Sequence, residues 1–223
     1  MLNDLQERHF YFVKDSFYER LNDGQLMYNK GRNHQRPCYC VKVEGDIAWL
    51  VPVTSQFETA KRVYDRCVEK YGRCDTVVLG WIGGERGGLM LAKSFPITKN
   101  FVSKEVLVAS DQPYYLRDPL RISPRKEAMV ERMFNKILYM WREKKCCLFS
   151  PDWDKILKFL DDNKVLCFES NNIRAFYNGN MVTVKNTETK ESCCFIEDRT
   201  KIPDKKSFEE YMVNWICSRT RFG

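Results

Sequence analysis

Histidine is scarce in this chain of 223 residues, which holds only two, His9 and His34. The chain has ten cysteines, but no two of them are separated by two residues, so the usual spacing of a structural zinc site is missing. Carboxylates are scattered along the sequence and do not gather around a histidine. We therefore expect no metal ion and no other cofactor.

Long apolar runs are also missing. No segment approaches ~18 uninterrupted apolar residues, so we expect no helix that spans a membrane. The first 17 residues lack the apolar stretch and the small-residue cleavage site of a secretory signal. These absences predict a cytoplasmic protein whose cysteines stay reduced and act as small hydrophobic residues.

Well-known catalytic motifs are absent too, among them the phosphate loop of nucleotide hydrolases, the dinucleotide fingerprint and the serine-hydrolase elbow. The chain is nevertheless 43% hydrophobic, which is enough to build a core. Its length suits one large domain or one domain with a small appendage. The formal net charge of +7 is compatible with a polyanionic partner without requiring one.

The most informative stretch is residues 36–55, which has the pattern of a β-hairpin. Apolar and charged residues alternate over 41–44, Gly45 and Asp46 interrupt the pattern, and an apolar run resumes over 47–51. In an antiparallel pair, the start of the first strand lies beside the end of the second. A basic, polar segment therefore meets a pair of hydroxyl groups at one edge of a sheet, which predicts a phosphate-binding corner built from Lys30, Arg32, His34, Arg36, Thr54 and Ser55.

The remaining pattern to residue 145 predicts a strongly curved antiparallel sheet with helices outside it. The glycine-rich segment 82–88 is expected to be a hairpin turn, because no helix follows to make it a phosphate loop. Residues 95–102 are expected to form a turn and 105–110 a strand. The other predicted strands lie near 8–13, 37–44, 47–53, 75–81 and 88–93, and the helices at 57–71 and 125–145.

The sequence changes character after residue 150. A short helix at 151–163, four strand-like runs and a terminal helix at 207–217 predict a small α+β extension. We therefore expect a main domain at 1–150 and an extension at 151–223 that is packed on it.

The residue types at the corner are those that metal-free RNA cleavage requires. The RNA supplies its own nucleophile, the 2′-hydroxyl, and the protein has to stabilise the charge that grows on the phosphate oxygens. Lysine, arginine and hydroxyl side chains serve that purpose. His34 is a possible acid or base, since the usual pKa of histidine, ~6.5, is near neutral pH, although a lone histidine in a basic loop is more often a surface residue.

The order of these segments resembles the ToxN/AbiQ/CptN endoribonuclease toxins of type III toxin–antitoxin systems. The similarity covers roughly residues 8–145 and includes FYFVKDSFYERL, a basic loop, RPCYCVKVEGDIAWLVPVTS, the helix after it, and FPIT. It implies an α+β fold with an SH3-like, Kid/MazF-like curved antiparallel β-barrel and added helices. It also implies metal-independent cleavage of RNA to a 2′,3′-cyclic phosphate, and a role in phage defence.

The resemblance further implies an antitoxin made of repeat RNA, folded as a pseudoknot, and a ring-like complex with it. Thr54 and Ser55 match the family's hydroxyl pair, and Arg36 falls near its loop lysine. Tyr28 or Lys30 takes the place of its loop tyrosine. The lysine that usually follows the serine is replaced by Phe57, and Lys61 is the nearest substitute. The implied catalytic residues are Thr54, Ser55, Arg36 and Lys30, and the implied RNA-binding residues are Tyr28, Arg32, His34 and Lys61.

Two other functions fit the same residues. In a non-catalytic RNA- or DNA-binding barrel, the cations and hydroxyls would only position a phosphate. A MazF-like toxin with a protein antitoxin would instead offer an apolar groove for a peptide.

Overall fold

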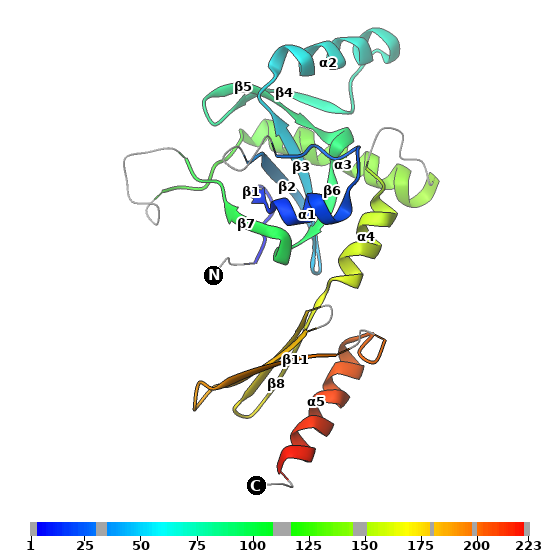
Figure 1. Cartoon of the computed structure of the whole chain (residues 1–223). Coiled ribbons are helices and arrows are strands. Elements are labelled where there is room, and N and C mark those ends of the chain that lie inside the picture. Colours follow the sequence, from blue (N-terminus) through cyan, green and yellow to red (C-terminus); the bar gives the residue numbers. More distant parts are fainter. Residues whose placement is uncertain are drawn as a thin grey trace. The chain divides into compact units, whose positions relative to one another are not determined.

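A computed structural model describes residues 4–29, 35–108, 117–144, 151–178, 181–197 and 200–220 (Figure 1). The chain divides into two compact units, residues 1–157 and 158–223. Each unit contains an antiparallel sheet and helices, so the predicted α+β class is confirmed. In the described part of the chain, no helix combines the length and the apolar character needed to cross a membrane.

The first unit is built on an antiparallel sheet in which β6 pairs with β3 beside the main strand order β4-β5-β3-β2-β1-β7. The predicted hairpin of residues 37–54 is present, and Gly45 at its turn has a φ of 60°, which glycine adopts at low cost. The strands are β1 Phe10–Val13, β2 Pro37–Glu44, β3 Ile47–Thr54, β4 Val77–Ile82, β5 Glu85–Met90, β6 Phe95–Thr98 and β7 Val102–Glu105.

Strand β3 contacts two different strands in succession along one edge. Its first half pairs with β6, and its last residues, Val53 and Thr54, pair with Leu89 and Gly88 of β5. The sheet curves so far that Ile82 of β4 and Lys104 of β7, from its opposite ends, line the same cavity. No pairing joins β4 to β7 among the described residues, so the sheet is open and the predicted closed barrel is not confirmed.

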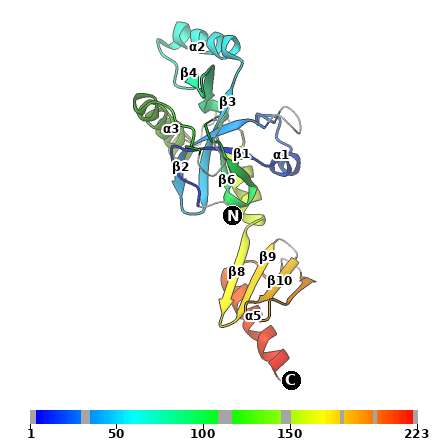
Figure 2. The same cartoon turned by 90° about the vertical axis from the view of Figure 1, so that its left-hand side faces the viewer.

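Among the described residues, the helices of this unit are α1 Asp15–Leu21, α2 Phe57–Tyr71, α3 Pro124–Lys144 and the start of α4 Trp153–Asp162, which continues into the second unit. Helix α2 has the predicted bounds and ends at Gly72, whose φ of 71° allows a left-handed cap. It lies beside the β4–β5 hairpin in both views (Figures 1 and 2). Helix α3 buries Phe134 against Trp49, with ring centroids 5.7 Å apart.

The short strands after β5 differ from the sequence prediction. Strand β5 ends at Met90 and a 3-10 turn, Leu91–Lys93, follows it, whereas the sequence predicted a strand to residue 93. The expected turn at 95–102 is strand β6 followed by a second 3-10 turn, Lys99–Phe101. Four residues are too few for a periodic signal, and β6 is held by its pairing with β3. The strand expected at 105–110 is β7 at 102–105, and residues 109–110 lie outside the described ranges.

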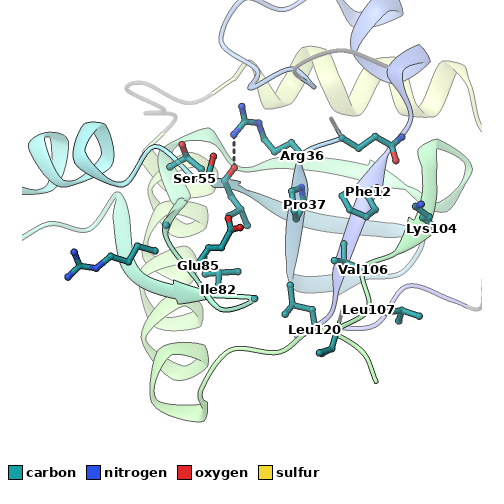
Figure 3. A pocket seen from close by; sticks show the side chains of 17 residues that line it. Phe12, Arg36, Pro37, Ser55, Ile82, Glu85, Lys104, Val106, Leu107 and Leu120 are labelled. Atoms are coloured by element: carbon teal, nitrogen blue, oxygen red, sulfur yellow. Dashed lines mark hydrogen bonds between the residues drawn. The ribbon is translucent and has the colours of Figure 1, made fainter. Parts of the chain in front are cut away.

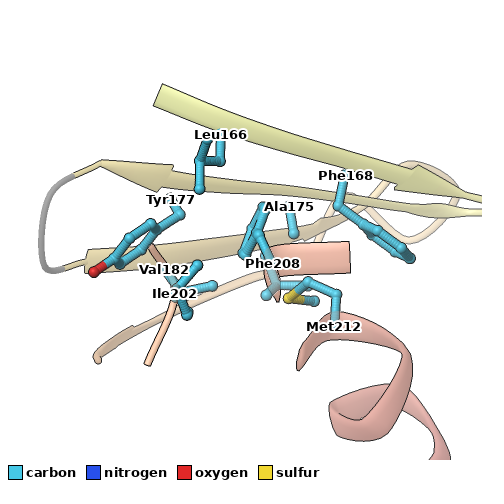
Figure 4. Packing of buried hydrophobic residues seen from close by; sticks show 9 residues of the cluster. Leu166, Phe168, Ala175, Tyr177, Val182, Ile202, Phe208 and Met212 are labelled. Atoms are coloured by element: carbon cyan, nitrogen blue, oxygen red, sulfur yellow. The ribbon is translucent and has the colours of Figure 1, made fainter. Parts of the chain in front are cut away.

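The second unit is a four-stranded antiparallel sheet in the order β11-β10-β9-β8, with one helix packed on it. Phe208 and Met212, one helical turn apart, join the buried side chains of Ala175, Tyr177 and Val182 (Figure 4). Its elements are β8 Val165–Ser170, β9 Ile173–Asn178, β10 Met181–Asn186, β11 Ser192–Ile196 and α5 Lys205–Thr220.

The described cysteines are all free thiols. Cys38, Cys40 and Cys74 are buried in the first unit, and burial raises the pKa of the Cys38 and Cys40 thiols to about 12. They behave as the small hydrophobic residues that the sequence predicted. That expectation is wrong for the second unit, where Cys167 of β8, Cys193 and Cys194 of β11 and Cys217 of α5 are exposed, and both β8 and β11 are edge strands of the sheet.

Candidate functional site

Arg36, Thr54 and Ser55 lie together at one end of the β2–β3 hairpin. Arg36 immediately precedes β2, Thr54 is the last residue of β3, and Cys38 pairs with Pro52 between them. All three line one cavity of about 830 Å³. The structure therefore brings these three sequence-predicted residues to a single surface.

Arg36 is held in place by hydrogen bonds to backbone groups. One terminal nitrogen of its guanidinium donates to the Val53 carbonyl at 2.6 Å, drawn as a dashed line in Figure 3, and Nε donates to the Tyr28 carbonyl at 3.3 Å. Its own backbone N–H donates to the Asn29 side chain at 2.8 Å. These bonds leave other guanidinium N–H groups to bind an anion in the cavity.

The two hydroxyl groups have different environments. Thr54 is buried, and its Oγ1 accepts a hydrogen bond from the Gln56 N–H at 3.2 Å. A hydroxyl that accepts a backbone N–H keeps its own proton, so Thr54 can still donate to an oxygen in the cavity. Ser55 is exposed, and its carbonyl accepts the Phe57 N–H at 2.9 Å. Ser55 is therefore the hydroxyl that a large substrate reaches most easily.

A close approach of two strands closes the corner behind these hydroxyls. A Cβ built on Gly87 of β5 would lie 2.7 Å from the Thr54 carbonyl oxygen. Only glycine permits this separation, because real Cβ atoms do not approach a backbone oxygen so closely. The glycine-rich segment 82–88 forms the predicted hairpin turn, at Gly83 and Gly84, and it also allows β5 to pack against the corner.

We expect Gly87→Ala to lower the free energy of unfolding by about 1–3 kcal/mol, because the added methyl group forces β5 away from Thr54. Urea unfolding followed by circular dichroism measures this change. Gly24→Ala is the matched control, since no atom lies within 4 Å of its added Cβ. Equal unfolding midpoints for the two variants would show that the approach of β5 to Thr54 is not a constraint.

The cavity contains polar residues that the sequence did not single out. Ser55 and Glu85 lie on one side, Phe12 and Lys104 lie on the other, and Arg36 is between them (Figure 3). The Lys104 ammonium lies 5.5 Å from the centre of the Phe12 ring. The described residues that line the cavity are Phe12, Gln35, Arg36, Pro37, Val53, Thr54, Ser55, Ile82, Gly83, Glu85, Arg86, Gly87, Lys104, Val106, Leu107, Val108 and Leu120.

Two other predicted RNA-binding residues do not line this cavity. The Tyr28 hydroxyl donates to the Asp23 carbonyl at 3.2 Å, and its ring packs against Tyr18 with centroids 5.4 Å apart. Lys61 on α2 pairs with Asp65 at 2.6 Å, and that carboxylate raises the pKa of Lys61. Lys61 is exposed, but the negative charge of Asp65 offsets part of the positive charge that Lys61 offers to RNA. Lys30, Arg32 and His34 lie outside the described residues.

His9 is buried, which no pattern in the sequence indicates. His9 contacts the Glu105 carboxylate through Nδ1, and a terminal nitrogen of Arg121 lies 2.5 Å from its Nε2. Arg121 also donates to the Arg8 carbonyl at 3.1 Å. Since arginine only donates, Nε2 accepts and the Nδ1 proton faces the carboxylate. This cluster ties β7, and with it Lys104, to the start of β1. In the described ranges, no three histidine, cysteine or acidic side chains are grouped to hold a metal ion.

Comparisons with known proteins give a likeness to solved structures. No protein-family model and no curated protein sequence matches this chain. Among solved structures, a match is the structure described as "AbiQ, a lactococcal anti-phage endoribonuclease belonging to the type-III toxin-antitoxin system". The match covers 69% of this chain and 96% of that chain, with 14% sequence identity and a TM-score of 0.47. A TM-score this low does not establish a common fold.

Proposed function

We propose that this protein is a metal-independent endoribonuclease toxin that cleaves RNA at the cavity containing Arg36, Thr54 and Ser55. The observation that supports the proposal most directly is the meeting of a fixed guanidinium, an exposed serine hydroxyl and the Lys104 ammonium in one open cavity. Cations and hydroxyl donors around one space suit a phosphate group whose charge grows during reaction. The curved sheet that forms the cavity is proposed to be an open relative of the SH3-like barrel.

In the proposed reaction, the 2′-hydroxyl of the RNA attacks the adjacent phosphorus. A bond forms between O2′ and phosphorus, the bond from phosphorus to O5′ breaks, and the product ends in a 2′,3′-cyclic phosphate. Glu85 is the one carboxylate among the described lining residues and accepts the 2′-hydroxyl proton. Ser55, Thr54 and Arg36 donate hydrogen bonds to the phosphate oxygens. Lys30 adds positive charge, and a protonated His34 donates its proton to the leaving O5′, so that the step ends with Glu85 protonated and His34 neutral.

The resemblance in sequence extends the proposal to partners. A repeat RNA, folded as a pseudoknot, inhibits the toxin in a ring-like complex, and the pair acts in phage defence in the cytoplasm. Tyr28, Arg32, His34 and Lys61 contact RNA around the cavity. Residues 1–150 carry the endoribonuclease activity, and residues 151–223 are an α+β extension.

The test is cleavage of a single-stranded RNA by purified protein in excess EDTA. We expect full activity, because the side chains of the cavity supply both the positive charge and the hydrogen-bond donors that the phosphate needs. A DNA strand of the same sequence is the control and stays intact, since it lacks the 2′-hydroxyl. Cleavage that depends on an added divalent ion and is abolished by EDTA would contradict the proposed mechanism. Binding of RNA without cleavage would favour a non-catalytic binding protein.

A further inference from the structure

An exposed aromatic group lies beside the corner, on the β4–β5 hairpin and the start of α2. Trp81 of β4 is 62% exposed and pairs with Arg86 of β5 across the hairpin. The central guanidinium carbon of Arg86 lies 5.9 Å from the centre of the Trp81 ring and 4.9 Å from the centre of the Phe57 ring. We call Phe57, Trp81 and Arg86 the aromatic ledge.

The ledge is directly connected to the proposed cleavage site. Phe57 is two residues from Ser55 and donates its N–H to the Ser55 carbonyl at 2.9 Å. Arg86 lines the cavity together with its neighbours Glu85 and Gly87, and side chains alternate in direction along a strand. The Arg86 guanidinium lies over the Phe57 ring of α2, so Arg86 and its cross-strand partner Trp81 face α2, while the Glu85 side chain faces the opposite side of the hairpin. Ser55 lines the same cavity as Arg86 and is joined to Phe57 by the backbone hydrogen bond.

The chemistry of the ledge suits a nucleotide with an unpaired base. An exposed tryptophan face binds any base by stacking, and a planar guanidinium stacks on rings while its N–H groups bind phosphate. No carboxylate lies within ion-pair distance of Arg86 among the described residues. Its positive charge is thus available to a polyanion.

A cation over an aromatic ring does not by itself make a binding site. Lys70 lies 5.1 Å from the ring centre of Tyr71 at the far end of α2, and Tyr71 is 65% exposed. The ledge differs from this pair because it has two rings on one guanidinium and because it adjoins Ser55. Lys70 and Tyr71 therefore provide a matched control.

We propose that the aromatic ledge binds an unpaired base of RNA next to the phosphate that is cleaved. Trp81 stacks on the base, and Arg86, held between the two rings, contacts the neighbouring phosphate. The ledge thereby selects single-stranded RNA at this site over a duplex, whose bases are already stacked on one another. The inference rests on the proposed function, since it places a nucleotide beside Ser55.

The test measures affinity in a Ser55→Ala background, so that the RNA stays intact. The probe is a fluorescein-labelled single-stranded RNA, compared with a duplex of the same sequence and with a strand carrying one abasic ribose at the cleaved site. We expect Trp81→Ala to weaken binding of the intact strand roughly 5- to 150-fold. It should leave duplex and abasic RNA almost unchanged. Trp81→Phe keeps most of the affinity, and Tyr71→Ala has no effect.

The outcomes separate this inference from the proposed function. Equal affinity of the Trp81→Ala and parent proteins for the intact strand would show that the aromatic ledge does not bind the base. The proposed cleavage at the cavity would be unaffected. An equal loss for intact and abasic strands would also overturn the inference, because stacking on the base would then contribute nothing. If the parent protein binds no single-stranded RNA and the wild type cleaves none, the proposed function fails as well. Unfolding midpoints confirm that Trp81→Ala is folded, as expected for an exposed side chain.

Discussion

Ser55→Ala is expected to lower the rate of RNA cleavage by about 100- to 1,000-fold, the usual effect of removing one donor that stabilises a transition state. The variant should fold normally, because the Ser55 side chain is exposed and the carbonyl that accepts the Phe57 N–H is kept. Single-turnover cleavage of a labelled RNA measures the rate, and thermal unfolding checks the fold.

Two controls accompany this measurement. Ser192→Ala removes an exposed hydroxyl from β11 of the second unit, and Lys185→Ala removes an exposed cation from β10. We expect both to cleave at the wild-type rate. Full activity of Ser55→Ala would show that this hydroxyl does not act on the phosphate, and the active site would have to be sought elsewhere.

Arg36→Ala is expected to have a similarly large effect on cleavage, again about 100-fold or more. It should also weaken RNA binding, and this loss should shrink at high salt because it comes from charge. Stability should fall too, by about 1 kcal/mol, since the Val53 carbonyl loses its donor at 2.6 Å.

Arg36→Lys separates charge from geometry. Lysine keeps the positive charge but cannot donate from a planar group to the Val53 and Tyr28 carbonyls and to a phosphate at once. We therefore expect salt-dependent binding close to that of the wild type and a loss of about 10- to 100-fold in cleavage. If Arg36→Ala and the wild type cleave at the same rate, Arg36 has only a structural role.

The sequence predicts those elements of the fold that have a clear local signal. Helix α2 follows from its apolar periodicity and from Gly72, and the β2–β3 hairpin follows from alternation around Gly45. The closeness of Arg36 to Ser55 is a consequence of antiparallel pairing within that hairpin. Strand β6 gave no such signal, since its four residues are placed by pairing with β3.

The rest of the cavity depends on contacts between residues that are distant in the sequence. Glu85 enters it because β5 pairs with the end of β3, where Thr54 opposes Gly88. Lys104 enters it because β7 pairs with β1 and the sheet curves. Hydrophobic periodicity reports which face of a strand is buried and not which strands become neighbours. The one sequence signal for this part of the cavity is the group of four glycines within residues 83–88. Glycines in a strand mark a close approach of two backbones as well as a turn.

The most direct test of the account is the chemistry of the cleaved end. Wild-type protein is incubated in EDTA with an RNA oligonucleotide, and separately with a copy that has a single 2′-deoxy nucleotide at the cleaved position. The masses of the products are then measured by mass spectrometry. We predict that the unmodified strand yields a 2′,3′-cyclic phosphate and that the modified strand is not cleaved at that position. Cleavage of the 2′-deoxy strand there, or a product ending in a 3′-hydroxyl, would contradict attack by the 2′-hydroxyl at this site.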